Sequence, residues 1–222
     1  MKLNFLFTFI LAVVLSTGAF GQKTTHIVYN MSVSSDNPQM QSMQSMFEGS
    51  KMEIFANEKF CRVNLSLGSL TTTSTTVDLT AKDAVLLINS MAGKMAMKLN
   101  AEDLKKKDIE QNNLSVRLTD SVKKIAGYTC KKAILTTHDS LQLDMWYTTD
   151  LDLGELSGTP LEYDKIPGTP MEFSIQKGPI TMKCTASQVD LNATTDSATF
   201  DMTIPEGYKL MSLDDLKKMG GQ

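Results

Sequence analysis

Apolar residues alternate with polar ones over most of the chain, which is the period-two pattern of strands that bury one face. Ile27, Tyr29, Met31 and Val33 fall on one such face. The pattern predicts strands near 27–33, 52–56, 60–67, 95–99, 114–118, 128–137, 141–147, 171–176, 180–189 and 197–204, and a strand pair around a turn at 81–83. Strands with a single apolar face favour antiparallel pairing.

Helices are expected in only a few places. Asn100 is a suitable N-cap for a short helix over 101–111, and Ser212 with Asp215 resembles the capping box of a short C-terminal helix. Residues 150–170 are so rich in glycine and proline that they predict a long loop rather than a strand.

These elements predict a mainly β fold. We expect a single antiparallel curved sheet that forms an open half-barrel, with two or three short helices at its mouth. A two-sheet β-sandwich is the alternative. No repeat or composition change divides the chain, so residues 22–222 are expected to form one domain.

The N-terminal 21 residues have the pattern of a cleavable signal peptide. Lys2 precedes an apolar run over 5–15, which is shorter than the roughly 18 residues that a membrane-spanning helix needs. Ala19 and Gly21 provide the small residues of a cleavage site before Gln22, and no lipoprotein cysteine follows. We therefore expect a periplasmic or secreted protein without a transmembrane segment.

The charge balance argues against nucleic acid as a partner. The 222 residues carry 22 basic and 25 acidic side chains, for a formal net charge of −3. Arg62 and Arg117 are the only arginines, so the planar groups that bind phosphates bidentately are scarce.

Several ordered motifs resemble those of a family of exported Gram-negative bacterial proteins of unknown function. Residues 123–133 match K-x-I-x-G-Y-x-C-K-K-A, residues 146–148 read W-Y-T, and residues 158–163 match G-x-P-L-E-Y. The GLPGLI family is similar in the last of these motifs. The resemblance implies the fold of the LolA/LolB lipoprotein carriers, an open half-barrel whose helices cover an apolar cavity, and it implies no catalytic residue.

Methionine is the unusual feature of the composition. The chain contains 15, and Met40, Met43 and Met46 recur every third residue before Phe47. On a helix these side chains would form one soft apolar stripe. Three hypotheses remain open: packing on the sheet, a lid that binds an apolar ligand, and a soft-metal site that would take Cu(I). We do not expect this segment to bind Cu(I).

The three cysteines, Cys61, Cys130 and Cys184, fall on separate predicted strands. A disulfide between Cys130 and Cys184 and three buried free thiols are both compatible with an exported protein. The two histidines are expected on a strand face, His26, and in a solvated turn, His138. Neither position suggests a catalytic triad.

No motif for nucleophilic, metal-dependent or nucleotide-dependent catalysis occurs in the chain. We therefore expect a protein that is not an enzyme and needs no cofactor. Acidic residues in 150–155 and Lys105 to Lys107 are interpreted as solvated. The favoured function is a binder or carrier of a lipid or acyl chain, with Met40, Met43, Met46 and Phe47 as ligand-binding candidates. A protein-interaction module that uses the loop at 150–170, and a metal-handling protein that uses the methionines, are the alternatives.

Overall fold

The computed structural model describes residues 23–35, 37–38, 44–104, 115–136, 141–151, 153, 165–177, 180–196, 198–212 and 215. The expected signal peptide, residues 1–21, lies outside this set. No helix among the described residues is long and apolar enough to cross a membrane.

Strands dominate the described part of the chain. The elements are β1 (Thr24–Ser35), η1 (Gln44–Phe47), β2 (Lys51–Ala56), β3 (Phe60–Leu67), β4 (Thr71–Asp78), β5 (Asp83–Ser90), β6 (Gly93–Leu99), β7 (Ser115–Ile125), β8 (Tyr128–Thr136), β9 (Gln142–Thr148), β10 (Thr169–Lys177), β11 (Ile180–Ala193) and β12 (Lys209–Leu210). The element η1 is a 3-10 helix.

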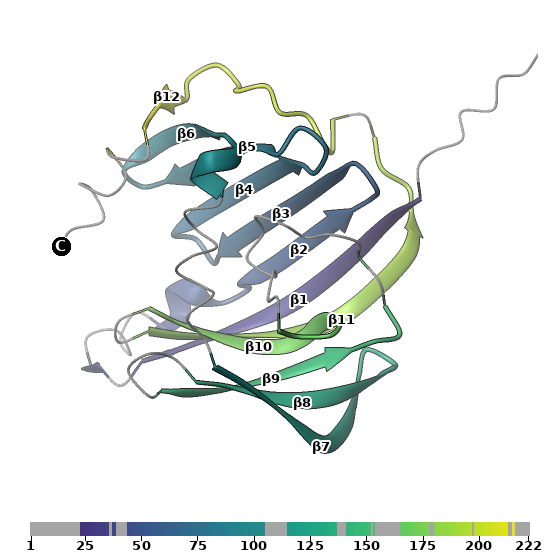
Figure 1. Ribbon diagram of the computed structural model, residues 1–222. Coiled ribbons are helices and arrows are strands. Elements are labelled where there is room, and N and C mark those ends of the chain that lie inside the picture. Colours follow the sequence, from purple (N-terminus) through teal and green to yellow (C-terminus); the bar gives the residue numbers. More distant parts are fainter. Residues whose placement is uncertain are drawn as a thin grey trace, which may run out of the picture.

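All of these strands belong to one sheet of 12 strands, in the order β12-β6-β5-β4-β3-β2-β1-β11-β10-β9-β8-β7. The sheet is open, because β12 and β7 lie at its two edges and do not pair with each other. Figure 1 shows how strongly it bends on the side of β7 to β11. This architecture confirms the curved half-barrel and excludes the two-sheet sandwich.

Strand registers confirm the predicted apolar face. Ile27 pairs with Ile54, and Ile54 pairs with Val63, so the three side chains share one surface of the sheet. We call this surface the inner face, and the surface that carries His26 and Phe55 the outer face. The predicted strands 52–56 and 60–67, the strand pair around 81–83, and the predicted strands 171–176 and 180–189 are present as pairs of adjacent antiparallel strands.

The prediction of a last strand over 197–204 is wrong. The described residues 198–204 form turns and irregular structure, because Asp201 accepts hydrogen bonds from the backbone and hydroxyl of Thr203, each at 2.8 Å. Such local bonds compete with strand pairing. The segment instead crosses the outer face, where Phe200 stacks on Phe60 with ring centroids 5.6 Å apart.

After this segment the chain forms the short strand β12, which pairs in parallel with β6. All other strand pairs are antiparallel, as expected. Figure 1 shows the C-terminal segment passing around this edge of the sheet. An edge strand with free N–H and C=O groups is prone to pair with another chain, and β12 covers part of β6.

Two of the predicted helix starts can be checked among the described residues. Asn100 caps a helical turn at 101–104, since its Oδ1 accepts hydrogen bonds from the backbone N–H groups of Glu102 (2.9 Å) and Asp103 (3.0 Å). The remainder of this predicted helix, 105–111, lies outside the described residues. The expected capping box at Ser212 is formed, because Ser212 N–H donates to Asp215 Oδ2 and Asp215 N–H donates to Ser212 Oγ, each at 3.1 Å.

Candidate functional site: the inner face of the half-barrel

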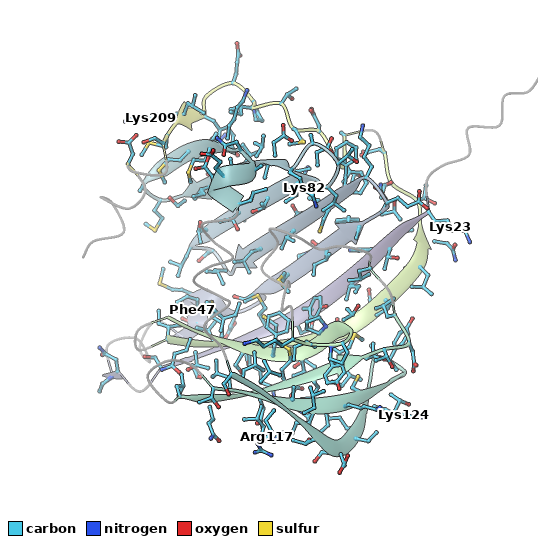
Figure 2. All side chains as sticks on the ribbon, viewed as in Figure 1. Lys23, Phe47, Lys82, Arg117, Lys124 and Lys209 are labelled. Atoms are coloured by element: carbon cyan, nitrogen blue, oxygen red, sulfur yellow. The ribbon has the colours of Figure 1, made fainter. Side chains whose placement is uncertain are left out.

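Both ends of the inner face are built from the same strands. At one end the connections β2–β3, β4–β5, β7–β8 and β9–β10 turn, and at the other lie η1 and the connections β3–β4 and β5–β6. Figure 2 shows Phe47 at one end of the sheet and Lys23, Lys82 and Lys124 at the other. We call the end that carries η1 and Phe47 the η1 end, and the end that carries the β2–β3, β4–β5, β7–β8 and β9–β10 connections the closed end.

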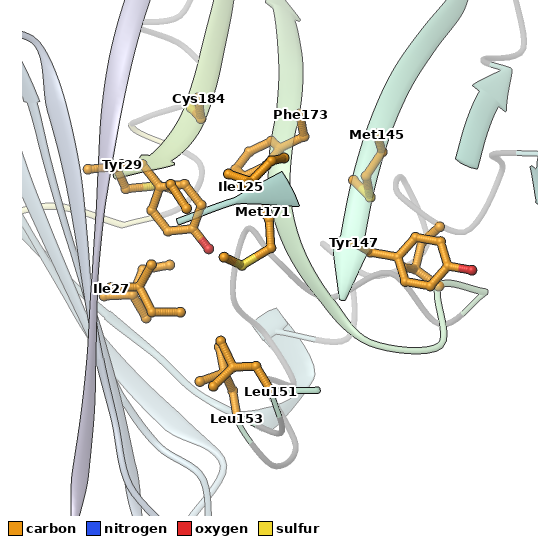
Figure 3. Close-up of a cluster of buried hydrophobic side chains, with 14 of the residues drawn as sticks. Ile27, Tyr29, Ile125, Met145, Tyr147, Leu151, Leu153, Met171, Phe173 and Cys184 are labelled. Carbon is orange, nitrogen blue, oxygen red and sulfur yellow. The ribbon is translucent and has the colours of Figure 1, made fainter. Parts of the chain in front are cut away.

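The closed end is packed with side chains. Its inner-face residues are each 0–3% exposed: Ile27, Ala56, Cys61, Val77, Ala84, Leu99 and Tyr147. Leu151, Leu153 and Ile166, from the connection between β9 and β10, are buried in the same cluster. Figure 3 shows Leu151 and Leu153 beside Ile27 and Met171. Leu104, from the helical turn at 101–104, packs against Val77 and Leu99. Loop residues therefore fill this end.

The η1 end is only partly covered, although its inner-face residues are as apolar. The half-buried set comprises Met31, Val33, Leu65, Ile88, Met95, Leu143, Ile175 and Met182. Its members lie on seven strands, and register pairs such as Val33 with Met182 and Ile88 with Met95 bring them side by side. Clustered apolar side chains that remain accessible are typical of binding surfaces.

The last part of the methionine segment, which runs from Met40 to Phe47, lies at this end as the 3-10 helix η1 (Gln44–Phe47). Met46 and Phe47 of η1 are half-buried, and Met40 and Met43 lie outside the described residues. The carbonyl of Met46 accepts a hydrogen bond from Ser69 N–H at 3.1 Å. Gly68 lies so close to this carbonyl that a Cβ would be 1.9 Å from it. The element η1 is therefore fixed to the β3–β4 turn.

All three cysteines are buried free thiols. The alternative of a Cys130–Cys184 disulfide is not realised in this structure.

The buried thiols do not have the properties of catalytic groups. Burial raises the pKa of Cys61 and of Cys184 to about 12, and it also raises the pKa of Cys130. Burial likewise raises the pKa of Tyr29, which the nearby thiols raise further, and the Tyr29 hydroxyl donates to the Pro170 carbonyl at 2.7 Å. At neutral pH these groups are protonated, so they act as packing groups.

His26 is separated from Cys61 by the sheet itself. Its ring stacks on Phe55 on the outer face, with centroids 4.1 Å apart, and its Nε2 lies 3.6 Å from Glu53 Oε1. Cys61 projects from the inner face, so the two cannot form a catalytic pair. His138 lies outside the described residues, and within those residues no cluster of three or more His, Cys, Asp or Glu has metal-binding geometry.

A charged cluster on the outer face ties β7 to β10 and β11. Glu172 Oε1 contacts Lys123 Nζ at 2.8 Å and Lys183 Nζ at 3.1 Å, and Thr185 donates to Oε2 at 3.2 Å. Lys123 Nζ also lies 4.3 Å from the centre of the Trp146 ring. Burial alone would raise the pKa of Glu172, but the hydrogen bonds from the two lysines outweigh it and lower that pKa. Both oxygens of the Glu172 carboxylate therefore have partners within the protein.

Sequence reasoning placed the candidate site in the methionine segment and missed most of the surface beside it. The half-buried residues of the η1 end belong to strands whose alternation was recognised, but alternation does not tell which end of a strand is covered. Exposed Asp150 is the only described member of the acidic set in 150–155.

A comparison with family models identifies the class of domain. The family described as "N-glycanase peptide, N-terminal domain" matches residues 27–164. This match covers more than half of the chain, and the chain belongs to that family. The similarity to the GLPGLI family and to the LolA/LolB carriers was inferred from motifs alone and stays a prediction.

Among solved structures, one titled "Crystal structure of MucB" is similar, with a TM-score of 0.36 and 10% sequence identity. The alignment covers 84% of this chain and 58% of that one, so this chain spans less than two thirds of its length. No curated protein matches the sequence.

Proposed function

We propose that this protein is a non-enzymatic binder or carrier of an apolar ligand, a lipid or acyl chain, in the cell envelope. The observation that carries the proposal is the difference in burial along the inner face. Side chains at the closed end are buried by other residues of the chain, whereas the apolar side chains of the half-buried set at the η1 end are only partly covered. Burying such a surface stabilises a complex by roughly 25 cal/mol per Å².

Methionine suits this role. Met31, Met95 and Met182 contribute to the η1 end, and Met46 lies on η1. Unbranched thioether side chains adapt to ligands of different shape and are common on binding surfaces of broad specificity. The alternative of a soft-metal site has no support from the described residues, and we do not propose it.

A non-enzymatic role agrees with the chemistry of the candidate nucleophiles. The thiols have raised pKa values, and His26 lies on the opposite face of the sheet from Cys61. Under this proposal, incubation with an N-glycosylated peptide should release no glycan, as judged by mass spectrometry of the peptide. Glycan release by the purified chain would contradict this part of the proposal.

The central experiment compares ligand binding by two neighbouring variants. Ile88 faces the η1 end and Leu87, the next residue on β5, faces outward; both are half-buried. We expect Ile88→Gln to weaken the binding of a dansyl-labelled fatty acid about five- to tenfold, and Leu87→Gln to leave it unchanged. Protein purified from the native host should also release lipid on extraction. Lipid-free protein that does not bind the labelled fatty acid would overturn the proposal.

The family favours a second candidate, a module that acts beside another protein or domain. Its description names the N-terminal domain of an N-glycanase, a domain defined by its position next to others. The loop at 150–170 is the expected contact. Because Leu151, Leu153 and Ile166 belong to the core, deletion of the whole loop would unfold the protein. Replacing residues 155–163 by a Gly/Ser linker avoids this, and should abolish partner capture while leaving fatty-acid binding intact.

A further inference from the structure

Strand β4 carries hydroxyl side chains where its neighbours carry apolar ones. Its sequence is TTTSTTVD, so every position from 71 to 76 is threonine or serine. On the inner face, Thr73 lies between Leu65 of β3 and Ile88 of β5, and Thr75 lies between Val63 and Leu86. Two hydroxyl-bearing residues thus stand in the middle of an apolar surface.

The change from apolar to hydroxyl follows the change in burial. Val77, the next inner-face residue toward the closed end, is 1% exposed, whereas Thr73 and Thr75 are half-buried. Valine and threonine have nearly the same shape. A hydroxyl that is buried against apolar groups without a hydrogen-bond partner lowers the stability of the folded protein by roughly 1–3 kcal/mol. Threonine therefore suits positions 73 and 75 only if a polar group reaches them.

The part of the chain that the structure describes does not supply that group. Thr71, at the rim of the sheet, donates to the Asn89 carbonyl at 3.1 Å. For Thr73 and Thr75, no side-chain hydrogen bond to any part of the chain is found within the described residues. Their hydroxyls remain available to water or to a ligand on the inner face.

We propose that Thr73 and Thr75 form a polar anchor within the apolar surface, which selects an amphiphile whose hydrogen-bonding group adjoins its hydrocarbon chain. This inference rests on the proposed binding of an apolar ligand and names its class. A glycerol ester has such a group, since its carbonyl accepts and its hydroxyls donate and accept hydrogen bonds. Ligand sites commonly combine an apolar lining with a few polar groups that fix orientation.

The test uses two probes and a matched pair of variants. N-phenyl-1-naphthylamine reports apolar contact by its fluorescence, and monooleoylglycerol reports the anchor by displacing it. The double variant Thr73→Val/Thr75→Val removes both hydroxyls and preserves shape and β propensity. Thr72→Val makes the same change on the outer face of β4 and serves as the control. Thermal unfolding checks that all three proteins are folded.

We expect the double variant to bind the naphthylamine as tightly as the wild type, or up to about threefold more tightly. It should bind monooleoylglycerol about tenfold more weakly, because two hydrogen bonds to the ligand are lost. Thr72→Val should change neither. Unchanged displacement by monooleoylglycerol in the double variant would overturn the anchor and leave the proposed function standing. Wild-type protein that binds neither probe would overturn both.

Discussion

The two ends of the inner face differ in what covers them and hardly in their own composition. The closed end is sealed by Leu151, Leu153 and Ile166 from one connection and by Leu104 from another. At the η1 end, residues of the same kinds are only half-buried. Strand alternation thus defines the apolar surface, and the connections decide which part of that surface is core and which part is available to a ligand.

The largest contrast should appear in thiol reactivity. Cys61, Cys130 and Cys184 are buried with raised pKa values, so none should react with a thiol reagent in the native protein at neutral pH. A cysteine introduced at the η1 end by Ile88→Cys should react readily. Mass spectrometry after labelling should find one label on the folded variant and none on the wild type. In guanidinium the wild type should take up three labels; one label would instead indicate a disulfide.

Replacing an isoleucine by alanine should lower the free energy of unfolding more in the buried core than at the η1 end. Ile54 is fully buried, and Ile54→Ala should lower the free energy of unfolding by about 2–5 kcal/mol. Ile88→Ala, on the half-buried end, should cost only roughly 1 kcal/mol. Urea denaturation followed by circular dichroism gives both values. Equal losses would mean that the η1 end is packed as tightly as the rest.

A buried hydrogen bond contributes to the packed region. The Tyr29 hydroxyl donates to the Pro170 carbonyl at 2.7 Å, and Tyr29→Phe leaves that carbonyl without a donor. We expect a loss of about 1–3 kcal/mol in the free energy of unfolding. Tyr208→Phe, at a half-buried position on the C-terminal segment, is the control and should cost less. Comparable losses in the two variants would contradict the assigned role of the bond.

The smallest effect is expected at Glu172, on the outer face. Its lowered pKa means that the carboxylate stabilises the fold above the ordinary glutamate pKa, and that this contribution is lost as the pH falls through the lowered value. Glu172→Gln should therefore cost roughly 1 kcal/mol or less near pH 7, and less still below about pH 4. Thermal unfolding at both pH values measures this, with exposed Glu206→Gln as the control. A cost that grows on acidification would reverse the assigned sign.

Most of the sheet was predictable because local alternation and turns specify it. The faces of β1, β2 and β3, the turn at 81–83 and the cap at Asn100 all follow from residues close in sequence. The last strand was mispredicted because alternation in 197–204 was outweighed by the local hydrogen bonds of Asp201 and by the stacking of Phe200 on Phe60.

The candidate site was less predictable, because burial at a sheet surface depends on contacts between distant segments. Leu151, Leu153 and Ile166 flank a stretch rich in glycine and proline that predicts an exposed loop, yet they fill the closed end. Their apolar character was the available signal. The run of hydroxyl residues in β4 shows no apolar alternation from position 71 to 76, and only the strand registers place Thr73 and Thr75 on the inner face.

The most direct test of the account locates a bound ligand along the inner face. Protein labelled with ¹³C at its methionine methyl groups would be mixed with a fatty acid that carries a nitroxide, and the signals would be assigned by single Met→Leu substitutions. We predict that the signals of Met31, Met95 and Met182 at the η1 end broaden most, and that the signal of buried Met171 broadens little. Broadening that is equal at all sites, or strongest at Met91, which is 86% exposed on the β5–β6 turn, would contradict a specific site on the inner face.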